Sequence, residues 1–98
     1  MANIISQDDL CDILLEICSD WEESADQNNV TKQKLREIYN TAVWSIKNTA
    51  WTQPKDGYYI LSAKLKVKIA VKQHIRDSGQ CYFLNQIVDK YFPVVNRQ

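Results

Sequence analysis

The first amphipathic segment spans residues 7–25, where apolar residues recur every three or four positions, as on one face of a helix. This apolar stripe consists of Leu10, Ile13, Leu14, Ile17 and Trp21. Ser6 is the predicted N-cap, because a serine oxygen accepts a hydrogen bond from a free backbone N–H of the first turn. Asp9, three residues later, completes an approximate capping box. The pattern therefore predicts a helix, followed by a polar loop at residues 27–29.

The second segment, residues 31–51, combines a predicted core face with a second apolar feature. Its core face consists of Leu35, Ile38, Tyr39, Ala42 and Ile46. Thr31 is the predicted N-cap of this helix. Trp44 points about 180° away from the core face, at about 100° per residue. Trp51 falls close to Trp44 if the helix continues that far, so this helix is predicted to carry an apolar surface outside the core.

Residues 58–77 show two competing periodicities. Strict alternation, which predicts a strand, is shown by Leu61, Ala63, Leu65, Val67, Ile69 and Val71. A helical face at 3.6 spacing is formed instead by Ile60, Ala63, Val67, Ala70, Val71, His74 and Ile75. We favour the helix, because no other segment alternates and a lone strand would leave its backbone groups unpaired. On that helix Leu61, Leu65 and Ile69 lie well off the main face; pairing between chains is the alternative if the segment is extended.

The last predicted helix covers residues 80–92. Its apolar set is Phe83, Leu84, Ile87, Val88 and Tyr91. Ser78-Gly79 predicts a break before it, and Pro93 predicts its end. Residues 93–98 form a short tail.

Composition supports a helical chain. Only two glycines and two prolines occur in 98 residues, which is too few for a turn-rich β fold. The length allows one core, so residues 1–98 are predicted to form a single all-α domain, a small four-helix bundle or an orthogonal helical array. No apolar run approaches the roughly 20 residues that span a bilayer, and the first residues do not resemble a signal peptide. We therefore expect a cytoplasmic protein without membrane contact.

Charge is segregated along the chain, although the formal net charge is zero. Eight acidic and no basic residues fall in residues 1–27, whereas ten basic and three acidic residues fall in residues 28–77. On helices, residues four apart line one flank. The acidic stripe defined in this way is Asp8, Asp12, Glu16 and Asp20. The basic stripe is Lys64, Lys68, Lys72 and Arg76, with Lys66 beside it. The spacing leaves open whether the two stripes pair with each other or face a partner.

Residues suited to chemistry are few. His74 is the single histidine, and no carboxylate or cysteine lies at helical spacing on its own side. Cys11 and Cys18 would be about 10 Å apart on one helix, too far for a disulfide. With Cys81 they do not have the spacing of a zinc site, and no phosphate-binding glycine loop is present. We expect no enzymatic activity, metal or cofactor.

The leftover apolar surface and the charge stripes favour recognition over catalysis. The predicted protein interface comprises Trp44, Trp51, Leu61, Leu65 and Ile69. We expect a small protein–protein interaction module that binds another protein or itself as a homodimer, in the role of an inhibitor, immunity protein or antitoxin-like accessory protein. The alternative is a dimeric nucleic-acid-binding regulator. Its phosphate contacts would be Lys64, Lys66, Lys68, Lys72 and Arg76. Against this alternative, no nucleic-acid-binding motif is present.

Overall fold

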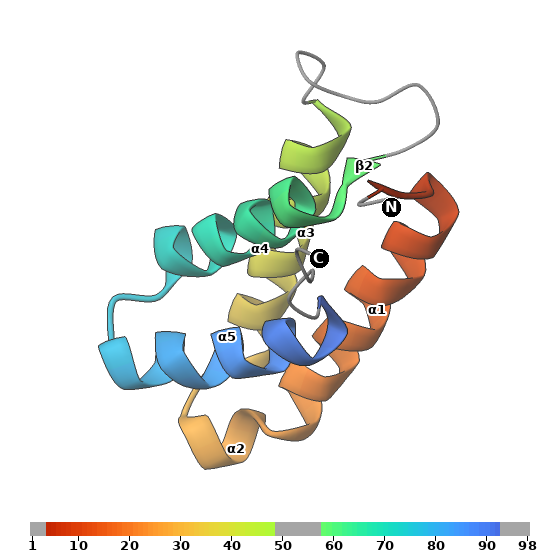
Figure 1. Cartoon of the computed structure of the whole chain (residues 1–98). Helices are drawn as coiled ribbons and strands as arrows, with labels where there is room; N and C mark the ends of the chain where they lie inside the picture. The colour runs from red at the N-terminus through yellow and green to blue at the C-terminus, as the bar shows by residue number, and fades with distance from the viewer. Residues whose placement is uncertain (1–3, 49–57, 93–98) are drawn as a thin grey trace, which may run out of the picture.

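The computed structural model describes residues 4–48 and 58–92, in which helices pack as a small array with a short two-stranded ribbon at one end (Figure 1). The elements in chain order are β1 (Ile4–Ile5), α1 (Gln7–Glu23), α2 (Ala25–Asn28), α3 (Lys32–Lys47), β2 (Tyr58–Tyr59), α4 (Ile60–His74) and α5 (Ser78–Tyr91). Helix α1 packs against α3 and α5, and α4 packs against the same two helices. The predicted all-α fold is confirmed.

Two predicted helix starts are confirmed by their caps. The Ser6 hydroxyl accepts a hydrogen bond from the backbone N–H of Asp9 at 3.2 Å. The Thr31 hydroxyl accepts one from the N–H of Lys34 at 3.1 Å. Both contacts satisfy an N–H of the first turn that has no partner within its helix.

The connection between α1 and α3 differs from the prediction. Residues 27–29 were expected to be a loop, but the short helix α2 reaches Asn28. Ser24 separates α1 from α2, and its hydroxyl donates to the carbonyl of Asp20 at 2.8 Å. Asn29 then ends α2 in the left-handed conformation, with φ of 58°. Asparagine tolerates this conformation better than most residues, so it closes the helix at low cost.

The segment with two periodicities is helical from Ile60 to His74, as predicted. The prediction is wrong for Tyr58 and Tyr59, which form β2 and pair antiparallel with β1. Ile4 lies opposite Tyr59, and Ile5 opposite Tyr58. Each strand of the ribbon has the other as its hydrogen-bonding partner, so neither is the lone strand that the sequence argued against.

Helix α5 begins two residues before its predicted start. Ser78 and Gly79 form its first turn, and the break lies at residues 75–77. Asp77 is the N-cap, and its Oδ1 atom accepts from the N–H of Gln80 at 2.9 Å. A carboxylate at this position satisfies a free N–H and complements the helix dipole, which outweighs the weak helix propensity of Gly79.

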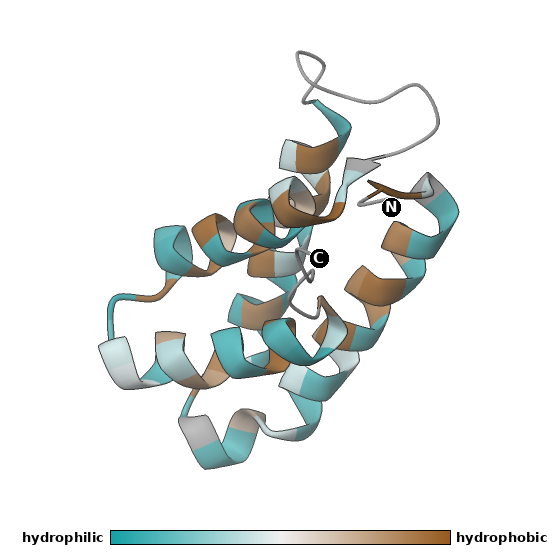
Figure 2. Ribbon diagram, in the orientation of Figure 1, coloured by the Kyte–Doolittle hydropathy of each residue, from teal (hydrophilic) through white to brown (hydrophobic). Residues whose placement is uncertain are grey.

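The core lies where α1, α3, α4 and α5 meet. In α3 the fully buried residues are Leu35, Ile38, Ala42 and Ile46, as the helical spacing predicted. Trp21 is 2% exposed, and its indole Nε1–H donates to the carbonyl oxygen of Leu84 at 3.2 Å, which joins α1 to α5. Apolar and polar segments alternate along the ribbon of α1, as expected of an amphipathic helix (Figure 2). Across the described ranges, no helix combines the length and apolar character needed to cross a bilayer.

Candidate protein-binding surface

Helix α4 is apolar on two opposite faces. Ala63, Val67 and Val71 are buried in the core. Leu61, Leu65 and Ile69 lie on the outer side and are 60%, 48% and 55% exposed. These three residues, spaced by four, form a row along the helix that we name the α4 ridge. The alternation that resembled a strand therefore places apolar residues both inside and outside the helix.

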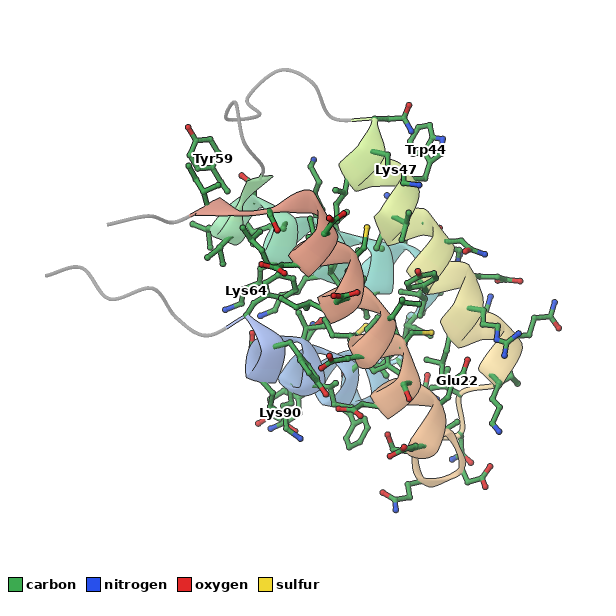
Figure 3. All side chains as sticks on the ribbon, turned by 90° about the vertical axis from the view of Figure 1, so that its right-hand side faces the viewer. Glu22, Trp44, Lys47, Tyr59, Lys64 and Lys90 are labelled. Carbon is green, nitrogen blue, oxygen red and sulfur yellow. The ribbon has the colours of Figure 1, made fainter. Side chains whose placement is uncertain are left out.

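Trp44 adds a large exposed aromatic side chain on the neighbouring helix. It is 66% exposed and projects near Lys47 at the C-terminal end of α3 (Figure 3). Helices α3 and α4 pack directly against each other. We group the exposed apolar side chains of these two helices, Trp44 and the α4 ridge, under the name α3–α4 apolar surface. Trp51, the other predicted interface tryptophan, lies outside the described residues.

Further apolar side chains are exposed at the end of the molecule that carries the ribbon. Tyr59 in β2 is 43% exposed and points outward (Figure 3), and Ile4 in β1 is partly exposed beside it in the register of the ribbon. Periodicity did not identify these two residues, because each strand is only two residues long. Tyr59 precedes Leu61 by two residues, and Ile4 lies opposite Tyr59 in the ribbon, so both are at the end of the molecule where α4 begins.

The basic stripe is partly neutralised within the chain. The carboxylate of Asp89 in α5 lies 2.8 Å from Lys68 Nζ and 3.2 Å from Lys64 Nζ. The hydrogen bond from Lys68, with a smaller effect of the one from Lys64, holds the pKa of Asp89 below its usual value. Sequence spacing missed Asp89 because it belongs to a different helix. In contrast, Lys72 and Arg76 are exposed and have no ion pair with any described residue. Lys66, beside the stripe, has an interaction partner of its own.

The acidic stripe faces outward over most of α1. Asp8, Asp12 and Glu16 are exposed. Asp20, at the other end, accepts a hydrogen bond from the Tyr91 hydroxyl at 2.5 Å. This bond, with burial and the charge of Asp20, raises the pKa of Tyr91 to about 12. Within residues 4–48 and 58–92, no ion pair links the acidic stripe to the basic stripe, because their helices do not form one of the main packing pairs.

His74 contacts two polar groups that belong to α3. Its Nε2 atom lies 2.8 Å from the Thr41 hydroxyl, and its Nδ1 atom lies 3.9 Å from a carboxylate oxygen of Glu37. A hydroxyl beside an imidazole resembles a nucleophile and base, but that chemistry needs a third group to orient the ring. Glu37 is beyond hydrogen-bonding distance of Nδ1 and also pairs with Lys34 at 3.4 Å. We interpret the cluster as a polar link between α3 and α4.

The three cysteines are unbridged and partly buried. Burial, with a smaller contribution from Glu22, raises the pKa of Cys18 to about 11, so its thiol is a weak nucleophile. Across the part of the chain that the structure describes, no group of three or more His, Cys, Asp or Glu residues is arranged to hold a metal ion.

Comparison of the chain with protein families, characterised proteins and solved structures gives no significant match. The surfaces of this molecule are therefore the guide to its function.

Proposed function

We propose that this protein is a small, non-enzymatic protein-binding module that recognises its partner through the α3–α4 apolar surface. The observation that carries the proposal is the exposure of Trp44, Leu61, Leu65 and Ile69 on two helices whose opposite faces already fill the core. Single exposed apolar residues are ordinary on protein surfaces. A largely exposed tryptophan and a regular row of large exposed aliphatic residues are more typical of interaction surfaces.

Burial of these side chains supplies the driving force for association. Removing a large apolar side chain from water is worth about 1.5–3 kcal/mol. Only part of this gain appears as affinity, because binding restricts the motion of both partners. Tryptophan is enriched among interface residues whose truncation costs about 2 kcal/mol or more, so Trp44 is the expected anchor.

The role that fits such a module is occupancy of another protein, as an inhibitor, immunity protein or antitoxin-like accessory protein. The exposed charges of this chain, the acidic stripe of α1 and the cations Lys72 and Arg76, support this role, because local patches of one charge select partners with complementary charge and accelerate association. A second copy of the chain is the other form of partner, which would give a homodimer. The nucleic-acid alternative is less well supported, because Asp89 occupies two of its five predicted phosphate contacts, Lys64 and Lys68.

Site-specific photo-crosslinking tests the proposal. A photoreactive amino acid is placed at Trp44 or at Leu61 in the cells that produce the chain, and at Gln33 as a matched exposed position on α3. We expect adducts with one defined protein, or with a second copy, from Trp44 and Leu61 but not from Gln33. Sedimentation of the wild type and of Trp44→Ala then separates self-association from binding to another protein.

The proposal is wrong if Trp44 and Leu61 give no adduct beyond that of Gln33 and the chain sediments as a monomer in both forms. Circular dichroism of Trp44→Ala provides the folding control. We expect an unchanged spectrum, because the side chain lies outside the core.

A further inference from the structure

A groove with a volume of about 640 Å³ lies between α4 and α5. The two helices are joined by residues 75–77 and lie side by side (Figure 1). Leu65 and Ile69 of the α4 ridge form part of one wall, and Tyr82 of α5 forms part of the other. The groove is therefore continuous with the α4 ridge.

The walls of the groove are apolar and accessible. Tyr82 is 67% exposed, and Leu65 and Ile69 are about half exposed. A pair of helices that presents aliphatic and aromatic side chains along a groove is a common receptor for the apolar face of a third helix. The groove therefore suits an amphipathic helical segment better than it suits an extended polar chain.

The rim at the C-terminal end of α4 is basic. Lys72 and Arg76 both line the groove and are exposed, with no ion pair to any described residue. Lys68 also lines it, but Asp89 already holds its ammonium group at 2.8 Å. Two cations are thus available to a ligand. Carboxylates on the flanks of a bound helix would complement them.

One groove residue also carries a polar atom that lacks a partner among the described residues. The side-chain oxygen of Asn85 is buried and accepts no hydrogen bond from the described residues. Asn85 lines the groove from α5. A buried acceptor without a donor is destabilising, but this oxygen has almost no accessible surface and so adds nothing to the binding surface of the groove.

We infer that the groove between α4 and α5 binds one acidic amphipathic helix of a partner protein, with its apolar face on Leu65, Ile69 and Tyr82 and its carboxylates at Lys72 and Arg76. This inference rests on the protein-binding function proposed above and specifies the chemistry of the partner. A second copy of the chain would have to offer α1 as its acidic helix. The apolar stripe of α1 is buried in its own core, and Leu15 is its one large exposed apolar side chain in the described residues, so a partner protein is the better occupant.

A designed peptide tests the inference. The probe is a labelled amphipathic helix with leucines on one face and glutamates on both flanks, and its control carries glutamine at each glutamate. Fluorescence anisotropy is measured at low and high salt. We expect saturable binding of the acidic peptide that weakens with salt, and binding of the glutamine peptide that is about tenfold weaker, equivalent to about 1.4 kcal/mol.

Matched variants locate the binding site. We expect Lys72→Glu with Arg76→Glu to weaken binding about tenfold. Lys32→Glu with Lys90→Glu makes the same charge change at exposed positions outside the groove and should leave binding unchanged. Leu65→Ser with Ile69→Ser should weaken binding of both peptides. Circular dichroism verifies that each variant is folded, since all the changed residues lie outside the buried core.

Cys81 also lines the groove, so its rate of alkylation is an independent measure of whether peptide occupies the groove. Bound peptide should slow alkylation of Cys81 but leave the rate at Cys11 on α1 unchanged.

No saturable binding of the acidic peptide up to about 1 mM overturns the inference, as does tighter binding of duplex DNA than of the peptide. Binding that depends on Trp44 but not on the groove variants also overturns it, while crosslinking at Trp44 would still support the proposed function.

Discussion

Two tryptophans of this chain occupy opposite environments. Trp21 is buried and hydrogen-bonded, whereas Trp44 is largely exposed and projects from the end of α3 (Figure 3). Helical spacing alone predicted this difference in burial, because Trp21 continues the apolar stripe of α1 and Trp44 lies opposite the core face of α3. The same residue type therefore contributes to stability at one position and is available for recognition at the other.

Trp21→Phe is expected to lower the free energy of unfolding by about 2 kcal/mol, because it removes a buried hydrogen bond and leaves unfilled volume. Denaturant unfolding followed by circular dichroism measures the change. Trp44→Phe is the matched control and should alter stability by less than about 0.5 kcal/mol. Equal losses in the two variants would contradict the assigned environments.

Cys18 is expected to be alkylated very slowly at pH 8, because its pKa of about 11 leaves about one thiol in a thousand as thiolate. The rate should rise about tenfold per pH unit and level off only near pH 11. Peptide mass spectrometry after timed alkylation gives the rate for each cysteine. Glu22→Gln should accelerate the reaction, since the charge of Glu22 raises the pKa of Cys18. A rate that levels off near pH 9 would show that burial does not control this thiol.

At the scale of elements, the contact between α4 and α5 includes an ion pair of Asp89 with two lysines. The lowered pKa of Asp89 means that the folded state holds its carboxyl group ionised more strongly than the unfolded state does. Its contribution to stability is thus present above the ordinary carboxyl pKa and is lost as pH falls through the lowered value. The carboxylate is half exposed, so solvent limits each pair to at most about 1 kcal/mol.

Asp89→Asn should therefore reduce the free energy of unfolding at pH 7, and the difference from wild type should shrink as the pH falls below about 4. Denaturant titrations across that range measure it. Asp12→Asn is the control, because Asp12 lies on the exposed acidic stripe and should show no comparable loss at pH 7. A difference that persists unchanged at low pH would assign the effect of Asp89→Asn to packing.

Elements were predictable where local signals agreed. Ser6 and Thr31 cap the helices that their positions predicted, and the apolar face of α3 is buried as its spacing required. Errors arose where a partner distant in sequence decides the structure. Tyr58 and Tyr59 form a strand because Ile4 and Ile5 lie beside them, and no periodicity can be read from two residues.

The candidate surface was predictable to a similar extent. Exposure of Trp44 and of the α4 ridge followed from helical geometry. The partial neutralisation of the basic stripe did not, because Asp89 approaches Lys64 and Lys68 from another helix. The groove between α4 and α5 also requires knowledge of which helices pack together, which sequence spacing does not provide.

For the whole molecule, the distribution of free cations predicts weak binding to nucleic acid. Five phosphate contacts from the predicted basic set would give a slope of log affinity against log salt of about −4.5, whereas Lys72 and Arg76 alone would give about −2. We expect at most the smaller slope with duplex DNA or RNA, measured by anisotropy at several salt concentrations. Asp89→Asn should steepen it by freeing Lys64 and Lys68. A slope near −4.5 in the wild type would favour the nucleic-acid-binding alternative.

The double periodicity of residues 60–72 also bears on the fate of the unfolded chain. Released from the fold, this stretch has the alternation of an aggregation-prone β-strand, with most of its aliphatic residues on one side. An extended form would gather Lys64, Lys66, Lys68 and Lys72 on the other side. Stacking identical chains in register would bring these ammonium groups into columns of mutual repulsion, so the residues that make the folded surface basic also act as gatekeepers against fibril formation.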